Sequence, residues 1–157
     1  MTGTSDLYDE HRDGAGVCLV QFQQYGGVRA FAGPISTVRC YEDNVLLKQQ
    51  ISTPGEGRVL VIDAGGSLRC ALIGDTIAGI GVEQGWAGIV LHGCVRDVAA
   101  LRELPIGLKA LGTNPRPSSK RGEGEIDVPV TFGELTFRPG AMLHSDEDGI
   151  VVLDAAR

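Results

Sequence analysis

The sequence lacks the features of several protein classes. It contains no apolar run of about 18 residues, which a transmembrane helix requires. Its first residues, MTGTSDLYDEHRD, include no apolar segment of the kind that a signal peptide carries. The four cysteines form no CxxC pair, which argues against a zinc ribbon or a thioredoxin-type redox site. We therefore expect a cytoplasmic protein that does not act at a membrane and keeps its cysteines reduced.

Phosphate-binding features are also scarce. The net charge is −6, from 14 basic and 20 acidic residues, and no long run of Lys and Arg offsets it. Because an acidic chain repels phosphate backbones, we expect no direct binding to nucleic acid. The stretch GGSLRC at 65–70 is not a GxGxxG motif and no Walker lysine follows it, which argues against nucleotide binding. A methyltransferase that uses S-adenosylmethionine would need a glycine-rich loop after its first strand and a larger domain.

The length of 157 residues suits one domain with its own hydrophobic core, and we expect a single domain over 1–157. Apolar residues make up 43% of the chain and charged residues 22%, as in an ordinary globular protein. Glycine is the exception, because its 23 residues are about twice the usual share. This excess predicts many turns and close backbone approaches.

Hydrophobic patterning predicts strands that alternate with short helices. The expected strands are 17–22, 28–33, 35–41, 58–64, 69–73, 87–93, 106–112 and 149–153, with a hairpin at 128–142. The expected helices begin near Ser5, Asp43, Asp75 and Asp97. Such alternation on short loops predicts parallel pairing in the middle of the chain. The fold class is therefore α/β with mixed parallel and antiparallel sheets, and 113–127 is a long loop of the functional or flexible kind.

Two charged segments follow predicted strands. Gly74 and Asp75 follow the strand at 69–73, and Arg96 and Asp97 follow the strand at 87–93. Ligands of α/β sheets bind beyond the carboxyl ends of strands, and free N–H groups at a helix start favour an anion. An adjacent Arg and Asp provide a cation and an oxygen ligand, and Mg²⁺ needs only one or two protein carboxylates. The same residues also suit ordinary helix caps and a surface ion pair, so the spacing leaves both interpretations open.

Other polar residues give weaker signals. The histidines His11, His92 and His144 lie far apart without metal-binding spacing, so we expect surface or structural roles. The run DED at 146–148 indicates a charged turn before the last strand. The alternative is that this run supplies carboxylates to a site on a neighbouring subunit.

The stretch from Asp75 to Asp97 has the form D-x20-R-D, and it resembles the class II aldolase and regulator of ribonuclease activity A family. The likeness extends to TSDLYDEH, FAGPISTVRCYEDN, PGEGRVLVIDAGGSLRCALIGD, GLKALGTNPRPSSKRGEGE and SDEDGIVVL. It therefore covers nearly the whole chain. The resemblance implies a layered β/β/α swivelling domain that assembles as a ring-shaped homotrimer.

The resemblance implies two functions. One arm of the family contains metal-dependent aldolases that cleave 4-hydroxy-4-methyl-2-oxoglutarate to two pyruvates and also decarboxylate oxaloacetate. The other arm contains regulators said to bind and inhibit a ribonuclease E-type endonuclease. We interpret the chain as a 2-oxo acid lyase, with the ribonuclease regulator as the alternative.

The resemblance also implies roles for particular residues. Asp97 would hold a divalent metal, Mg²⁺ or Mn²⁺, directly or through water. Asp75 would hydrogen-bond a water on that metal or help to move a proton, and Arg96 would face the C2 oxygen of the 2-oxo acid. The substrate carboxylate would lie on the N–H groups of the stretch Gly74, Asp75, Thr76 and Ile77.

The implied chemistry is the formation of pyruvate enolate. Cleaving the bond beyond C3 of a 2-oxo acid leaves an electron pair that must be delocalised onto the C2 oxygen, where a metal and Arg96 stabilise it. Aldol cleavage also needs a base for the C4 hydroxyl, whereas decarboxylation does not. Aldolases of this family tend to carry an acid three residues after the metal-binding Asp, where this chain has Ala100. That difference puts the aldol base in doubt and favours the regulator subgroup, while decarboxylation stays open.

Overall fold

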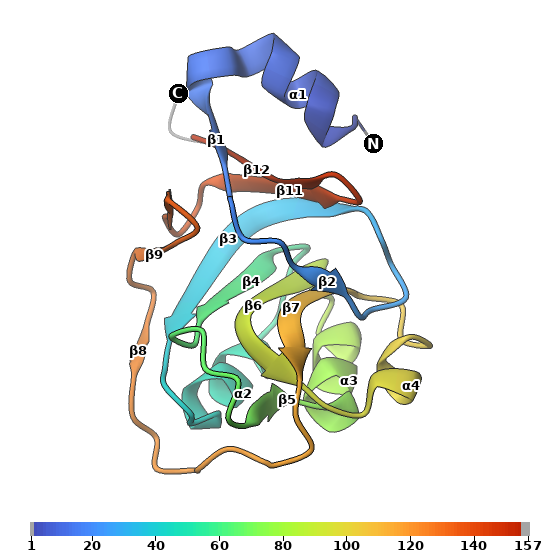
Figure 1. Cartoon of the computed structure of the whole chain (residues 1–157), viewed down its shortest axis with the longest axis vertical. Helices are drawn as coiled ribbons and strands as arrows, with labels where there is room; N and C mark the ends of the chain where they lie inside the picture. Colours follow the sequence, from blue (N-terminus) through green and yellow to red (C-terminus); the bar gives the residue numbers. More distant parts are fainter. Residues whose placement is uncertain (1, 155–157) are drawn as a thin grey trace.

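The structure is a computed structural model that describes residues 2–154 (Figure 1). Within these residues a ten-stranded sheet has the order β1-β12-β11-β3-β4-β6-β7-β2, with β5 beside β6 and β8 beside β3. Its strands are β1 (Ala15–Val17), β2 (Gln23–Gln24), β3 (Phe31–Arg39), β4 (Val59–Asp63), β5 (Ala71–Ile73), β6 (Gly88–Val95), β7 (Gly107–Thr113), β8 (Glu125–Ile126), β11 (Met142–Asp146) and β12 (Gly149–Leu153). A separate hairpin consists of β9 (Val130–Phe132) and β10 (Leu135–Phe137). The helices are α1 (Thr4–His11), α2 (Val45–Ile51), α3 (Asp75–Glu83) and α4 (Val98–Leu101), with a 3-10 turn at Arg12–Gly14.

The parallel centre of the sheet explains the most apolar segment of the sequence. Strands β3, β4, β6 and β7 pair in parallel, as the alternation of strands and helices predicted. In β4, Val59 and Val61 pack into one hydrophobic cluster, whereas Leu60 and Ile62 pack into another on the opposite face. All four side chains are fully buried. Both faces of β4 are covered, so the strand reads as a continuous apolar run.

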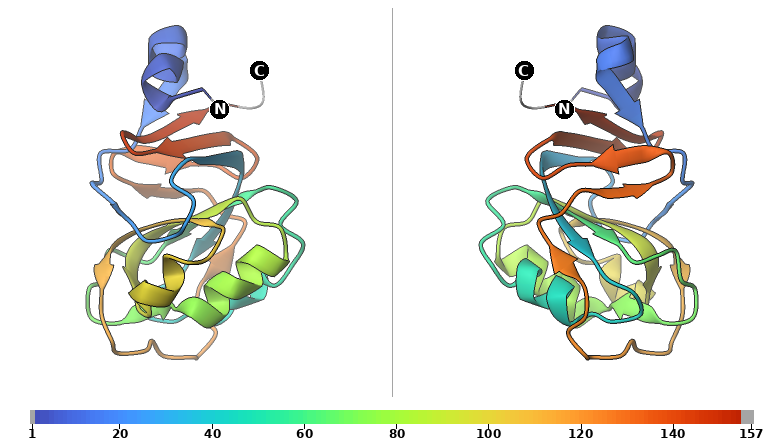
Figure 2. Two further views of the ribbon diagram at one scale, coloured as in Figure 1. Left: turned by 90° about the vertical axis from the view of Figure 1, so that its right-hand side faces the viewer. Right: turned by 90° about the vertical axis from the view of Figure 1, so that its left-hand side faces the viewer.

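The molecule has three layers (Figure 2). Helices α2, α3 and α4 contribute Leu47, Ile77 and Leu101 to the cluster on one face of the parallel strands. The C-terminal strands and the β9–β10 hairpin contribute Phe137 and Leu143 to the cluster on the other face. The layered β/β/α arrangement with mixed sheets is therefore confirmed. No helix within residues 2–154 has the length and apolar character to cross a membrane.

The two ends of the described chain meet in one corner of the sheet. Strand β1 pairs antiparallel with β12, so that Ala15 lies opposite Leu153. The carboxylate of Asp146 accepts hydrogen bonds from the backbone N–H of Thr4 at 2.8 Å and from its hydroxyl at 2.7 Å. Asp146 thus anchors the first residue of α1. The predicted charged turn at 146–148 is confirmed, and it holds α1 in place.

A buried lysine supports the same turn from the parallel sheet. Lys109 in β7 is only 4% exposed, and burial lowers the pKa of its side chain. Its Nζ donates hydrogen bonds to the backbone oxygens of Asp146, at 2.7 Å, and Gly149, at 3.4 Å. The turn is therefore fixed on one side by α1 and on the other by β7.

Two sequence predictions near the N-terminal end were wrong. Residues 18–22 form no strand, because Cys18 and Leu19 donate their N–H groups to Ile150 and Gly133 in separate, irregular contacts. The strands predicted at 28–33 and 35–41 form a single strand, β3, which runs through Pro34. Pairing of β3 with β4 begins at the next residue, so the missing N–H of the proline interrupts no bond of that parallel ladder.

The predictions for the remaining segments fit more closely. The hairpin turns at Gly133 and Glu134 between β9 and β10, as expected. The loop predicted at 113–127 carries one short strand, β8, which pairs with the end of β3. The four cysteines are buried and form no disulfide.

Candidate functional site

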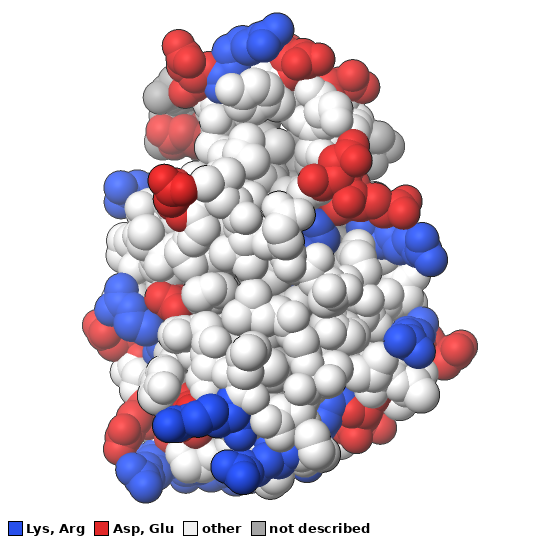
Figure 3. Space-filling model, viewed as in Figure 1, with Lys and Arg blue, Asp and Glu red and all other residues white. Residues whose placement is uncertain are grey.

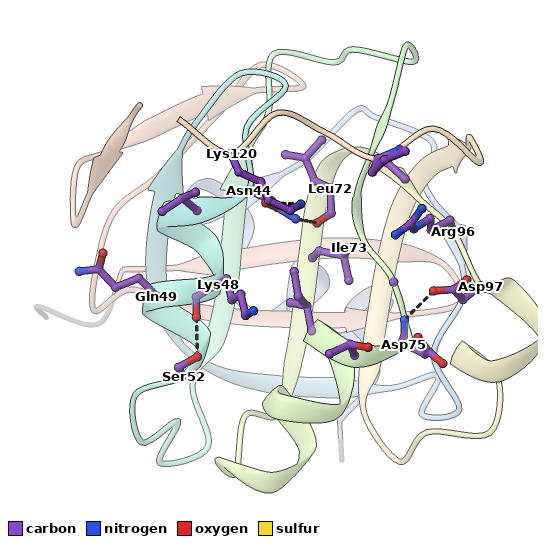
Figure 4. Close-up of a pocket in the computed structure, with 16 residues that line it drawn as sticks. Asn44, Lys48, Gln49, Ser52, Leu72, Ile73, Asp75, Arg96, Asp97 and Lys120 are labelled. Carbon is purple, nitrogen blue, oxygen red and sulfur yellow. Dashed lines mark hydrogen bonds between the residues drawn. The ribbon is translucent and has the colours of Figure 1, made fainter. Parts of the chain in front are cut away.

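A cavity of about 590 Å³ lies at the carboxyl end of β5, between α2 and α3 (Figure 4). This volume is within the range of sites that hold small ligands. All six predicted site residues line the cavity, which places in one site two segments that are 20 residues apart in sequence. They are Gly74, Asp75, Thr76, Ile77, Arg96 and Asp97.

The start of α3 presents N–H groups to this cavity. The first hydrogen bond of the helix runs from the N–H of Ala78 to the carbonyl of Gly74, at 3.1 Å. The N–H groups of the first turn, at Asp75, Thr76 and Ile77, therefore have no carbonyl within the helix to bond. That of Asp75 donates to Oδ2 of Asp97 at 3.2 Å. The next two N–H groups lie beside it in the cavity wall and suit an anionic ligand.

Asp97 reaches α3 because of an unusual backbone conformation and a missing side chain. Its φ of 61° and ψ of 42° lie in the left-handed region, which Asp adopts more readily than most residues. A Cβ atom at Gly74 would collide with Oδ2 of Asp97 and would lie 3.4 Å from Cγ of Arg96. Glycine at position 74 leaves room for the carboxylate where it lies, whereas a Cβ atom would move it. Asp97 is thus the N-cap residue of α4 by its backbone, while its carboxylate lies at the start of α3.

The alternative interpretation of these residues as helix caps fits the backbone position of Asp97, which is the N-cap residue of α4, but not the contacts of the two side chains. The side chain of Asp97 makes no capping bond to α4, and Gly74 is the N-cap residue of α3. The exposed carboxylate of Asp75 forms no hydrogen bond or ion pair with residues 2–154. Both carboxylates therefore have oxygen atoms available to a ligand or an ion.

Arg96 contributes the cation of this side of the cavity. Its backbone N–H donates to the carbonyl of Ile73 at 3.0 Å, which fixes the residue to the end of β5. Its Nη1 donates to the carbonyl of Pro115 at 3.3 Å. Within residues 2–154 the guanidinium forms no ion pair, so most of its donors are open to an anionic or carbonyl ligand.

The opposite side of the cavity carries residues to which the sequence gave no role. Lys48 comes from α2, and Asn44 precedes that helix, whereas Lys120 comes from the segment between β7 and β8 (Figure 4). Nδ2 of Asn44 donates to the carbonyl of Leu72 at 3.1 Å, and its Oδ1 lies 3.5 Å from Nζ of Lys120. The long loop predicted at 113–127 was the only sequence signal for this side.

A buried carboxylate holds this second side together. Asp43 is only 2% exposed, and its Oδ1 accepts the N–H of Val45 at 3.0 Å. Its Oδ2 accepts the N–H groups of Arg121 at 2.7 Å and Gly122 at 3.0 Å. Burial on its own would raise the pKa of Asp43, but these backbone hydrogen bonds lower it below the ordinary value. The start of α2 and the segment that carries Lys120 are therefore joined through one ionised group.

Other residues considered from the sequence lie outside the cavity. The ring of His92 stacks on Phe132 at 4.6 Å and lies 3.8 Å from Asp63, and none of the three histidines lines the cavity. Ala100 is exposed on α4 and is not part of the cavity wall. In the acidic turn, Asp146 is bound to Thr4, while Glu147 pairs with an arginine of the same chain.

The side chains that line the cavity suit an open site of the Mg²⁺ type and not a closed site of the structural zinc type. Residues 2–154 contain no group of three or more His, Cys, Asp or Glu side chains that could enclose a metal ion. A closed site such as that of structural zinc is therefore not formed by this part of the chain. A Mg²⁺-type ion needs one or two carboxylates, with water and substrate as its other ligands. Asp97, with Asp75 beside it, fits that requirement.

The chain belongs to the Aldolase/RraA family, whose RraA-like sequence profile matches residues 4–152. This membership agrees with the β/β/α fold and the D-x20-R-D segment that forms the cavity wall. The resemblance of the sequence to the class II aldolase and regulator of ribonuclease activity A family is thereby confirmed.

Solved structures show the same fold. A structure described as S-adenosylmethionine:2-dimethylmenaquinone methyltransferase from Geobacillus kaustophilus is 47% identical, with a TM-score of 0.96, over 98% of this chain and 95% of that one. The RNA-processing inhibitor RraA from Thermus thermophilis is 44% identical, with a TM-score of 0.94, over 98% and 93% of the two chains. RraAS2 from Streptomyces coelicolor, described as an unusual member of the RNase ES inhibitor RraA family, is 28% identical, with a TM-score of 0.78, over 97% and 78%.

Replacing Gly74 by alanine should displace Asp97 and leave the fold intact. The φ of −124° at Gly74 suits any residue, so the change acts through the collision with Oδ2 of Asp97. If the cavity is the active site of a metal-dependent enzyme, as proposed below, turnover should fall about 100-fold, as for other small displacements in active sites. Gly79→Ala is the matched control, because a Cβ there meets no atom within 4 Å and alanine favours the helix. Equal activity of both variants would contradict this account of Gly74.

Replacing Asp43 by asparagine should destabilise the protein by about 2–4 kcal/mol, because an amide group cannot accept all the N–H donors that the carboxylate accepts. The folded-state pKa of Asp43 is lowered, so its stabilisation is complete above the unfolded pKa of about 3.9 and is lost as the pH falls through the folded pKa. The difference in unfolding free energy between the two proteins should therefore shrink from pH 7 to pH 3. Urea unfolding at both pH values measures this, and a difference that grows in acid would contradict it.

Proposed function

We propose that this protein is a metal-dependent 2-oxo acid lyase that forms pyruvate through its enolate. Its reactions would be the aldol cleavage of 4-hydroxy-4-methyl-2-oxoglutarate and the decarboxylation of oxaloacetate. One observation carries the proposal: the Asp97 carboxylate, the unpaired Arg96 guanidinium and the open N–H groups of α3 line one cavity. Membership of the Aldolase/RraA family supports it.

The substrate would bind by its 2-oxo acid end. Its C1 carboxylate would accept hydrogen bonds from the N–H groups at the start of α3, in the stretch Gly74–Ile77, which offers open donors and a favourable helix dipole. The guanidinium of Arg96 would donate to the C2 oxygen. A positive donor at that oxygen stabilises the negative charge that develops there when the bond between C3 and C4 breaks.

The proposed cofactor is a divalent cation, Mg²⁺ or Mn²⁺, held by Asp97 with Asp75 nearby. When bound, such an ion supplies Lewis-acid polarisation of the C2 carbonyl. The backbone N–H of Asp75 bonds Oδ2 of Asp97, which fixes the direction of the carboxylate, while its Oδ1 has no hydrogen bond within residues 2–154. The carboxylate is therefore oriented with one oxygen open toward the cavity.

Proton transfer is assigned to Asp75. In aldol cleavage the C4 hydroxyl must lose its proton as the C3–C4 electron pair moves onto the C2 oxygen, and the enolate later gains a proton at C3. The Asp75 carboxylate lines the cavity without a hydrogen-bond partner in residues 2–154. Ala100 offers no proton acceptor, so we assign the hydroxyl proton to Asp75, with a water molecule or a carboxylate of another subunit as the alternatives.

The alternative function is a protein that binds and inhibits a ribonuclease E-type endonuclease. It is favoured by two solved relatives that are described as inhibitors of RNA processing or of an RNase. Acidic side chains gather over α1 and the turn between β11 and β12, at the end of the molecule opposite the cavity (Figure 3). Such a face suits a basic segment of a protein partner.

Methyl transfer is not proposed, although one relative is described as a methyltransferase. The glycine pair at 65–66 follows β4, but the next regular element is β5 and not a helix. The turn therefore lacks the helix start on which nucleotide-binding glycine loops depend.

Replacing Asp97 by asparagine should abolish metal-dependent turnover and leave the fold intact. Asparagine adopts the left-handed conformation and can still accept the N–H of Asp75, so stability should change by less than about 1 kcal/mol. Pyruvate release from both oxo acids should fall at least about 100-fold when it is assayed with Mg²⁺ or Mn²⁺.

Activity of the asparagine variant equal to that of the unmodified protein would overturn the metal assignment. If the unmodified protein releases no pyruvate and both forms capture ribonuclease E in a pull-down, the regulatory alternative replaces the lyase. The two functions are therefore separated by the same pair of proteins.

We also propose a homotrimer, in which a neighbouring subunit completes the cavity. The cavity wall of one chain has only two carboxylates, Asp75 and Asp97, and closed symmetric assemblies are the usual oligomers. The acidic turn at 146–148 is less available to a neighbour than the sequence suggested, because Asp146 is bound within its own chain. Sedimentation equilibrium should give three times the chain mass of 16.5 kDa, and a monomer at micromolar concentration would contradict the proposal.

A further inference from the structure

One side of the cavity has no part in the chemistry proposed above. Lys48 and Lys120 line it, facing Arg96 and Asp97 across the cavity (Figure 4). Neither lysine forms an ion pair with any residue of 2–154. The nearest polar group to Nζ of Lys120 is Oδ1 of Asn44, at 3.5 Å. No carboxylate of the described chain therefore lies within ion-pair distance of either ammonium group, because Asp75 and Asp97 line the other side of the cavity.

The segments that carry these lysines are held in place. Lys48 follows Leu47, which is fully buried and anchors α2 on the sheet. The residue after Lys120 is bound through its N–H to the buried carboxylate of Asp43, at 2.7 Å. Asn44 is oriented by its bond to Leu72, so that its oxygen points to Lys120. Both cations therefore project from fixed backbone, although their side chains are solvent-exposed.

The cavity is larger than a pyruvate unit requires. One end offers the N–H groups of α3 and Arg96, and the other offers the two lysines. Between them, Leu72, Ile73 and Ile77 line the wall with apolar side chains. Positive groups therefore lie at both ends of the cavity, with an apolar wall between them. This arrangement is complementary to an elongated acid with an anionic group at each end.

We propose that Lys48 and Lys120 bind the second carboxylate of a dicarboxylic 2-oxo acid and select such acids over monocarboxylic ones. This inference rests on the proposed function, because it assumes that the 2-oxo acid end lies at Arg96. The two lysines are specificity-determining residues, since they would touch the second carboxylate and not the C2 oxygen on which the negative charge develops.

The same contact should strengthen binding of both substrates but should affect the bond-breaking step of the two proposed reactions differently. In 4-hydroxy-4-methyl-2-oxoglutarate the second carboxylate stays on the departing pyruvate, so holding it favours the productive pose. In oxaloacetate the second carboxylate itself leaves as CO₂, and its bonding electron pair moves to C3 and onto the C2 oxygen. Lysines that stabilise this group as an anion strengthen binding but do not assist the step.

The first test is equilibrium binding without turnover. Titration calorimetry with Mg²⁺ present would compare pyruvate, which has one carboxylate, with 2-oxoglutarate, which has a second. We expect 2-oxoglutarate to bind at least about tenfold more tightly, and Lys48→Met with Lys120→Met to remove that advantage without changing the dissociation constant of pyruvate. The double variant Arg116→Met with Arg121→Met is the control. This control removes the same amount of positive charge from a neighbouring pocket, which the two arginines line. It should keep the tighter binding of 2-oxoglutarate over pyruvate.

The outcomes separate this inference from the proposed function. If pyruvate and 2-oxoglutarate bind equally well, or if the control lowers the preference as much as the lysine variant does, the lysine assignment is overturned and the lyase proposal stands. If the lysine variant loses binding of inorganic phosphate but shows no change toward 2-oxoglutarate, the carboxylate assignment is overturned. If neither oxo acid binds with or without Mg²⁺, both proposals fail together.

Steady-state kinetics provide the second readout. For oxaloacetate, the lysine variant should raise KM about tenfold while kcat stays the same or rises. For 4-hydroxy-4-methyl-2-oxoglutarate, kcat/KM should fall by at least the same factor. A merely structural role of the lysines would lower kcat for both substrates, and that result would overturn the inference.

Discussion

The buried carboxylate of Asp43 is the interaction on which the shape of the cavity depends. It joins the start of α2 to a segment 78 residues further along the chain, and it does so through backbone N–H groups alone. No cation within residues 2–154 pairs with this carboxylate. Backbone donors of this kind do not depend on the side chain of Arg121, so a side chain of that segment can serve a ligand without loss of the bond, whereas Gly122 is needed for its positive φ of 84°.

The other side of the cavity depends on a second carboxylate, that of Asp97. Asp97 also accepts a backbone N–H, from Asp75, but it is exposed and its second oxygen has no partner in the described chain. Asp43 uses both oxygens to hold the structure, whereas Asp97 uses one to fix its position and keeps one for a ligand. Its left-handed backbone costs about 1–2 kcal/mol, which is typical of functional sites.

The sequence predicted those parts of the fold and site that arise from local patterns. The run at 58–64 indicated a buried parallel strand, and D-x20-R-D indicated which residues share the cavity. The break predicted at Pro34 was wrong, because whether a proline interrupts a sheet depends on the start of the neighbouring ladder. Asn44, Lys48 and Lys120 were missed because the start of α2 and the long loop meet through contacts between distant residues, such as the Asp43 hydrogen bonds, which leave no local periodicity in the sequence.

The contacts at the edge of the sheet also determine which parts of the protein can fold first during synthesis. Strand β1 pairs only with β12, and Thr4 bonds Asp146 across 142 residues of chain. During synthesis α1 therefore leaves the ribosome long before its anchor exists, while β3, β4, β6 and β7 can already pair. The parallel layer and its helices can form first, and α1 with β1 must wait for 142–153. The nascent chain thus exposes the hydrophobic face that β11, β12 and the β9–β10 hairpin later cover, which makes this face the aggregation-prone surface of the unfinished protein.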